Sequence, residues 1–137
     1  MSEPIDLPDA DFPDAEDWLC ALLAPRGHAC TSLPAPQERF NELIPVIWIT
    51  RNGGARDDIT DRPRMTVAVF AYDRKLAVKV SGQCRNDILS PDVVSVNGIT
   101  LDSAKETTAV TRIQDPVDKA LRVIQASYEL SFRRVFY

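Results

Sequence analysis

The sequence predicts an α+β fold in which two helices pack on a mixed or mainly antiparallel sheet of four to five strands. Period-two alternation of apolar residues marks several short segments as strands, and apolar residues at three- and four-residue spacing mark two longer segments as helices. A length of 137 residues, with 45% hydrophobic and 26% charged residues, is typical of one soluble globular domain. We therefore expect a single hydrophobic core.

The N-terminal region divides into an extended arm and the beginning of the domain. Residues 1–11 contain four acidic residues and two prolines, which predicts an extended acidic arm, and residues 12–137 are expected to form the single domain. A helix is predicted from Pro13, which suits the first helical position, to about Leu23. Acidic residues in its first turn complement the helix dipole. Its apolar stripe consists of Ala15, Trp18, Leu19, Leu22 and Leu23.

Two central strands are predicted further along the chain. Residues 28–33 form a short strand candidate, and a proline-broken connection leads from there to Asn41. Apolar residues face both sides of the segments 43–51 and 65–72, so each is expected in the middle of the sheet. Pro63 lies at the entrance of the second strand, where a missing N–H group costs least.

A long, charge-dense connection is predicted between these two strands. The Asn52-Gly53 pair indicates a turn, and the segment 53–63 is longer than a hairpin requires, which is typical of functional loops. Its charges have two interpretations, a solvated charged face or a contact that fixes register between repeated subunits. We expect the loop 52–64 to project from the sheet and to contact a neighbouring subunit. The candidate interface residues are Arg51, Arg56, Asp57, Asp58, Asp61, Arg62 and Arg64.

A second amphipathic helix is predicted directly after the strand 65–72. Asp73 offers an N-cap, and the helical pattern continues to about Leu89. Gly82 weakens this helix by roughly 1 kcal/mol relative to alanine. Its apolar face consists of Leu76, Ala77, Val80, Cys84 and Ile88.

The C-terminal third is predicted to complete the sheet. Residues 91–100 are expected to form a loop with a turn at Asn97-Gly98, and residues 107–113 alternate as a strand. The segment 116–124 fits the start of either a helix or a strand. Cleaner alternation from 124 to 133 favours a strand.

Composition and cysteine pattern argue against several function classes. A net charge of -4 argues against a nucleic-acid-binding surface, which would carry a basic face. The sequence shows neither a secretory signal nor an apolar run long enough to span a membrane, so we expect a protein that is made and kept in a cytoplasm. Cys20, Cys30 and Cys84 lie in hydrophobic segments and are expected to be reduced core residues.

No catalytic, metal-binding or cofactor-binding residues are predicted, and we do not expect an enzyme. The run from Asp57 to Asp61 spells DDxxD, but it falls in a predicted loop without a second acidic motif, so a solvated loop explains it better than a magnesium site. His28 is the only histidine, and its spacing from Cys20 and Cys30 is unlike that of zinc ligands. No nucleophile motif accompanies this histidine.

Five segments, taken in order, resemble a known family. They are the acidic helix PDAEDWLCALL, the strand VIWIT followed by RNGGARD, the run TDRPRMTVAVFAYD, the helix after it, and the C-terminal YELSFRR. This order is similar to that of tail terminator proteins of siphovirus-type bacteriophages, in the form found in phages of actinobacteria. The resemblance covers roughly nine-tenths of the chain.

The resemblance implies a structural virion protein. Proteins of this family form a hexameric ring that closes the head-proximal end of the tail tube, ends tail polymerisation and docks the tail onto the head connector. The implied partners are copies of the same chain, the major tail tube protein and a head-tail connector protein, with DNA passing through the ring without sequence-specific binding. The implied location is the tail-neck region of the virion, after assembly in the host cytoplasm. Two alternatives remain, another neck or head-tail connector subunit and a small cytoplasmic ligand-binding domain.

Overall fold

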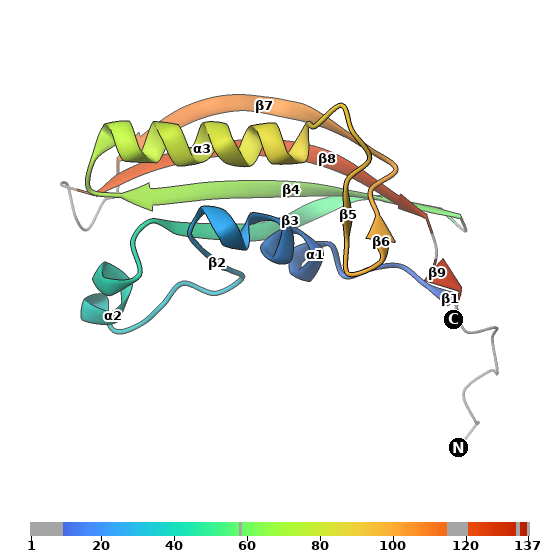
Figure 1. Ribbon diagram of the computed structural model, residues 1–137, viewed down its shortest axis with the longest axis horizontal. Helices are drawn as coiled ribbons and strands as arrows, with labels where there is room; N and C mark the ends of the chain where they lie inside the picture. Colours follow the sequence, from blue (N-terminus) through green and yellow to red (C-terminus); the bar gives the residue numbers. More distant parts are fainter. Residues whose placement is uncertain (1–9, 58, 115–120, 134, 137) are drawn as a thin grey trace, which may run out of the picture.

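A five-stranded mixed sheet forms the centre of the molecule and confirms the predicted α+β class (Figure 1). The computed structural model describes residues 10–57, 59–114, 121–133 and 135–136. The strands of this sheet are β2 (His28–Cys30), β3 (Val46–Arg56), β4 (Thr60–Ala71), β7 (Ser103–Gln114) and β8 (Arg122–Arg133). Their spatial order is β2-β3-β4-β8-β7, with β2 parallel to β3 and the other neighbours antiparallel.

Two helices pack on one face of this sheet. Helix α1 (Ala15–Leu23) contacts β3 and continues into a short 3-10 helix, η1 (Ala24–Arg26). Helix α3 (Arg74–Ile88) contacts β4 and β8 (Figure 1). An ion pair between Arg26 and Asp87, with 2.7 Å between Nε and Oδ2, joins η1 to α3. Both predicted helices are therefore present, and they cover the same side of the sheet.

Aspartate side chains begin both helices. Asp14 accepts hydrogen bonds from the backbone N–H groups of Glu16 and Asp17 at 3.0 and 3.2 Å. Pro13 therefore precedes the cap, and the prediction that it takes the first helical position is wrong by two residues. Asp73 caps α3 in the same way, as its position in the sequence predicted.

The main core lies between the sheet and these two helices. The ring of Trp18 on α1 meets the ring of Phe132 on β8 edge-on at 5.0 Å, and Trp18 Nε1 donates to the carbonyl oxygen of Ile99 at 3.0 Å. Strand residues that alternate toward this face supply the rest of the core. Among the fully buried side chains are Leu19, Leu23, Ile47, Ile49, Met65, Val69, Tyr128, Leu130 and Phe132.

A smaller cluster covers one end of the opposite face. The helix α2 (Gln37–Glu42) lies in the segment that was expected to be a plain connection, and it brings Phe40 against Phe70 with ring centroids 5.6 Å apart. Val46 and Val123 are buried in the same cluster. This second cluster explains why the sequences of β3 and β4 are apolar on both faces.

Small two-stranded pairings complete the described residues. Strand β1 (Ala10–Asp11) pairs with β9 (Val135–Phe136), while residues 1–9 of the predicted acidic arm lie outside the described residues. Strands β5 (Ser95–Val96) and β6 (Ile99–Thr100) form a hairpin inside the predicted loop 91–100. Its turn lies at Asn97-Gly98, as predicted, with φ of 51° and 79°.

The C-terminal strands agree with the prediction except at their beginnings. β7 begins at Ser103, four residues before the predicted position, and its pairing with β8 contains two register shifts. These irregularities obscure the period-two pattern that a sequence reading depends on. The ambiguous segment from 116 is described only from Leu121, and β8 begins at Arg122 as a strand.

The hairpin of β3 and β4 is the largest departure from the sequence prediction. Residues 53–63 were expected to form a long loop, but β3 extends to Arg56 and β4 begins at Thr60, which leaves a connection of residues 57–59. The Asn52-Gly53 pair does not form the turn. It lies at a register shift between Arg51 and Gly54, where Gly53 and Gly54 have φ of 90° and 111°.

Candidate assembly surface

A buried carboxylate organises the extended hairpin. Asp61 has no exposed surface, and its two oxygens accept hydrogen bonds from Arg51 Nη1 and Nη2 at 2.8 and 2.7 Å. Arg56 Nη2 donates to Asp61 Oδ2 at 3.1 Å. Arg51 and Arg56 belong to β3, and Asp61 belongs to β4. The three side chains therefore tie the two strands together around the register shift between Arg51 and Gly54. We call Arg51, Arg56 and Asp61 the ion triad.

The ion triad keeps Asp61 ionised. Burial by itself raises the pKa of the carboxyl group, but hydrogen bonds and charge attraction from the two guanidinium groups lower it further than burial raises it. The net result is a pKa below the ordinary aspartate range. The pKa of Arg51 is raised, first by its hydrogen bonds to Asp61. The attraction between these charges offsets the free-energy cost of burying an ionised aspartate at this position.

Arg56 also connects the hairpin to the N-terminal segment. Its guanidinium carbon lies 4.7 Å from the centre of the Phe12 ring, within the range of a cation–π contact. Half of the Arg56 side chain is exposed, against a quarter for Arg51. The two arginines of the ion triad therefore differ in how much water can solvate them.

A second set of contacts fixes the tip of the hairpin. Asp57 Oδ1 accepts the backbone N–H groups of Ile59 and Thr60 at 2.8 and 2.7 Å, and the backbone N–H of Asp57 donates to the carbonyl oxygen of Thr60 at 2.9 Å. These N–H bonds lower the pKa of Asp57, and the nearby Arg62 adds to the effect. These hydrogen bonds join Asp57 to Ile59 and Thr60 across the connection between β3 and β4.

Four of the seven predicted interface residues have one of these two roles. Arg51, Arg56 and Asp61 form the ion triad inside the hairpin, and Asp57 shapes the tip. Arg62 is exposed, 3.4 Å from Asp57, and Arg64 is exposed with no ionic partner in the part of the chain that the structure describes. Asp58 lies outside the described residues.

The sequence prediction missed two residues of this surface. Ile59 lies in the turn with 68% of its surface exposed, which is unusual for a large apolar side chain in an ordered tip. Phe12 supplies the ring under Arg56. An isoleucine among charged turn residues was a usable signal for the first, whereas nothing local in the sequence links Phe12 to the hairpin.

Of the residues considered for metal or thiol chemistry, Asp57 and Asp61 belong to this hairpin, whereas His28 and the three cysteines lie in β2, α1 and α3. Within the described ranges, no group of three His, Cys, Asp or Glu side chains is arranged to hold a metal ion. Cys20, Cys30 and Cys84 are all described and are unpaired. Burial raises the pKa of Cys84 to about 12 and, together with the charge of nearby residues, that of Cys20 to about 11. These thiols are protonated at neutral pH, as expected for structural cysteines.

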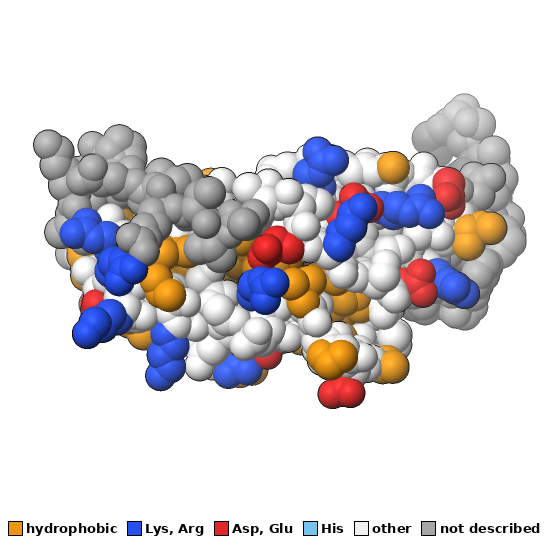
Figure 2. Space-filling model, turned by 90° about the horizontal axis from the view of Figure 1, so that it is seen from above, with side chains coloured by type: hydrophobic (Ala, Val, Ile, Leu, Met, Phe, Trp, Pro, Cys, Tyr) orange, Lys and Arg blue, Asp and Glu red, His pale blue; other side chains and the backbone are white. Residues whose placement is uncertain are grey.

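Charge is unevenly distributed on the surface that carries α3 and β7. Figure 2 shows Lys and Arg side chains gathered toward the end where α3 begins, whereas the other half of this surface carries both signs. Arg74, Lys75 and Lys79 are exposed on α3 and have no ionic partner among the described residues. The chain therefore presents chemically different surfaces at its two ends. None of the helices in the described residues is long and apolar enough to cross a membrane.

The fold is a small α+β one, in which clustered charges hold β3 and β4 together and shape an exposed hairpin. The family profile described as phage tail termination protein matches residues 11–136. The chain belongs to this family of structural virion proteins, and it is a component of a phage tail. The family resemblance seen in the sequence is thus confirmed, as is the expectation of a structural protein instead of an enzyme.

Two further comparisons complete the picture. No curated protein matches the sequence. A chain in a solved structure titled "Virion of native gene transfer agent (GTA) particle" is similar over 87% of each chain, with a TM-score of 0.49 and 12% sequence identity.

Proposed function

We propose that this protein forms a ring, of six copies, that closes the head-proximal end of the phage tail tube. The ring ends tail polymerisation and docks the tail onto the head connector. Its partners are other copies of the chain, the major tail tube protein and a head-tail connector protein, and DNA passes through the ring without being bound sequence-specifically. Assembly takes place in the host cytoplasm, and the mature location is the tail neck. The observation that carries the proposal is the family match over residues 11–136.

The geometry of the hairpin supports a repeated contact between copies. A ring requires two different surfaces on each protomer, one of which binds the other on the next copy. The hairpin offers one such surface because the ion triad ties its two strands together and Asp57 accepts the N–H of Ile59, and contacts that exist before binding reduce the conformational freedom lost on binding. Its exposed cations, Arg62 and Arg64, fix register more than they add affinity.

Purified protein and purified tail tubes test the proposal. We expect a cyclic oligomer by light scattering, rings in electron micrographs, and binding of those rings to one end of the tubes. Binding to isolated connectors but never to tubes would instead indicate another neck subunit. A protein that remains monomeric both alone and in the virion would contradict the ring.

A charge reversal at the tip tests the role of the hairpin separately. Arg62→Glu changes an exposed side chain, so the protomer should stay folded while assembly or tube binding weakens. Arg56→Glu is unsuitable for this purpose because it places a carboxylate against buried Asp61 and disturbs the fold itself. Unchanged ring formation and tail completion by Arg62→Glu would remove Arg62 from the proposed interface.

A further inference from the structure

One side of α3 combines positive charges with an apolar side chain. Lys75, Val78, Lys79 and Gly82 follow the spacing of a single helical face. Val78 has 42% of its surface exposed, and the two lysines are exposed beside it. A Cβ added at Gly82 would meet no atom within 4 Å, so the described residues leave the face open there. We call these four residues and Arg74 the cationic face.

The charges of the cationic face are not neutralised by the described part of the protomer. Arg74, Lys75 and Lys79 form no ion pair there. The neighbouring carboxylate, Asp73, accepts the backbone N–H of Lys75 at 3.0 Å and caps the helix. Figure 2 shows Lys and Arg side chains gathered toward this end of the molecule. The face is therefore complementary to a surface that carries carboxylates.

A recess of opposite character lies where α1 begins. It has a volume of about 240 Å³ and is formed by α1 and the β5–β6 hairpin. Trp18 Nε1 donates to the carbonyl oxygen of Ile99 at 3.0 Å, which ties these two elements together. The recess, which we call the acidic recess, is lined by Asp14, Asp17, Trp18, Val96, Asn97 and Ile99. It thus combines apolar walls with two carboxylates.

The carboxylates of the acidic recess are available to a partner. Asp14 and Asp17 form no ion pair with any described residue. Asp14 Oδ1 accepts two backbone N–H groups of α1, which leaves the negative charge in place. The pKa of Arg51 is raised first by its hydrogen bonds to Asp61 and last by the charges of Glu16 and Asp14, and both of its Nη atoms donate to Asp61. Arg51 therefore belongs to the ion triad and does not neutralise the recess.

We propose that the acidic recess of one protomer binds the cationic face of a second copy of this chain. Val78 then covers the apolar walls, which removes apolar surface from water on both sides, and the flanking cations lie beside the two carboxylates. In Figure 1, α3 begins at one end of the molecule, whereas β5 and β6 lie in the other half. Because the two surfaces are different, each protomer gives one face and receives another, and the contact repeats around a ring.

Exchanging one charge of each surface tests the contact in the full chain. Lys79→Glu and Asp17→Lys should each weaken self-association at least about tenfold in sedimentation velocity, because like charges then meet. An equimolar mixture of the two variants should assemble as the wild type does, since in an alternating ring every contact again joins opposite charges. A chain that carries both substitutions should also assemble. Lys105→Glu is the matched control, with 70% of its side chain exposed on β7, and should leave assembly unchanged.

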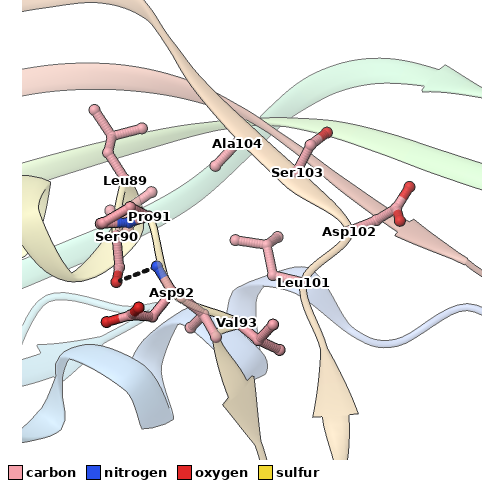
Figure 3. A pocket seen from close by; sticks show the side chains of 11 residues that line it. Leu89, Ser90, Pro91, Asp92, Val93, Leu101, Asp102, Ser103 and Ala104 are labelled. Carbon is pink, nitrogen blue, oxygen red and sulfur yellow. Dashed lines mark hydrogen bonds between the residues drawn. The ribbon is translucent and has the colours of Figure 1, made fainter.

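The apolar part of the contact has its own pair of variants. Val78→Asp should weaken self-association at least about tenfold, because it brings a third carboxylate to the acidic recess. Val93→Asp makes the same change at a valine with 82% of its surface exposed, in the loop after α3 beside Asp92 (Figure 3), and should assemble as the wild type does. Circular dichroism should show that both variants stay folded. Equal loss of assembly in the two variants would overturn the inference.

The inference rests on the proposed ring, and the outcomes separate the two. Failure of the wild-type protein to self-associate overturns both. Wild-type rings together with unchanged assembly of Lys79→Glu and Asp17→Lys overturn the contact alone. Weakened single variants that neither their mixture nor the doubly substituted chain restores also overturn it, because the loss then does not come from opposing charges at one interface.

Discussion

Replacing Asp61 by asparagine should destabilise the protomer strongly, although the residue lies near the tip of a surface hairpin. The change removes the charge on which Arg51 and Arg56 converge at 2.7 and 3.1 Å, and it leaves two guanidinium groups close together around a neutral amide. Breaking a fully buried ion pair costs about 3–5 kcal/mol. Because Arg51 and Arg56 are 25% and 50% exposed, water can partly solvate them, and we expect about 2–4 kcal/mol here.

The pH dependence provides the sharper test of this reasoning. The pKa of Asp61 is lowered on folding, so the stability gained from its ionisation is complete above the unfolded-state pKa of about 3.9 and is lost as the pH falls through the lower folded value. The difference in unfolding free energy between wild type and Asp61→Asn should thus be constant from neutral pH to about pH 4 and narrow below it.

Urea unfolding followed by circular dichroism measures this difference. The protomer concentration must be held constant, because self-association adds to the apparent stability. Asp57→Asn is the matched control, since an amide oxygen can still accept the N–H groups of Ile59 and Thr60, and it should be much less destabilising than Asp61→Asn. A variant Asp61→Asn as stable as the wild type at pH 7, or a gap that does not change between pH 4 and pH 2, would refute the role of the ion triad.

Three further predictions concern the backbone and the thiols. Gly53→Ala should lower the free energy of unfolding by about 1 kcal/mol because of its positive φ alone. Gly54→Ala should lower it by roughly 3 kcal/mol, because a Cβ there also collides with the carbonyl oxygen of Arg62. Equal melting temperatures of the two variants would contradict this. Gly82→Ala should stabilise α3 by about 1 kcal/mol and raise the melting temperature by about 4 °C, since the added methyl meets no atom within 4 Å; a lower melting temperature would argue against it. At pH 8, Cys20 and Cys84 should react slowly with a thiol reagent until urea exposes all three cysteines, and metal analysis that finds stoichiometric zinc would contradict unliganded thiols.

The sequence predicted well those helices and strands whose apolar residues repeat at a single spacing. The stripe of α1 and the face of α3 follow helical spacing, and Ala15, Trp18, Leu19, Leu23, Ala77, Val80, Cys84 and Ile88 are buried as expected. Leu22 and Leu76 are only partly buried, at the margins of the two helical faces. Alternation likewise identified β4 and β8. The six-residue helix α2 is too short to show a period, and it exists because Phe40 has a ring to pack against on the sheet.

The hairpin was misread because its pattern depends on pairing that a linear sequence does not display. Arg51 and Asp61 are ten positions apart and meet only when β3 and β4 pair beyond the bulge at Gly53 and Gly54. Aspartate is usually exposed to solvent, so as long as the strand pairing is unknown, the sequence around Asp61 predicts a loop and not a strand with a buried aspartate.

This same correction narrows the candidate interface. Charges already satisfied within a protomer gain little from a partner, because new contacts would have to replace existing ones. The ion triad therefore belongs to folding, and the proposed interface is reduced to the groups that the fold leaves exposed. Outside the ion triad, the exposed candidates of the described hairpin are Asp57 and Ile59 at the tip and Arg62 and Arg64 along β4, and Arg62 lies 3.4 Å from Asp57. The charged residues between positions 51 and 64 thus fall into two groups, those whose contacts stabilise the hairpin and those that are exposed on its surface.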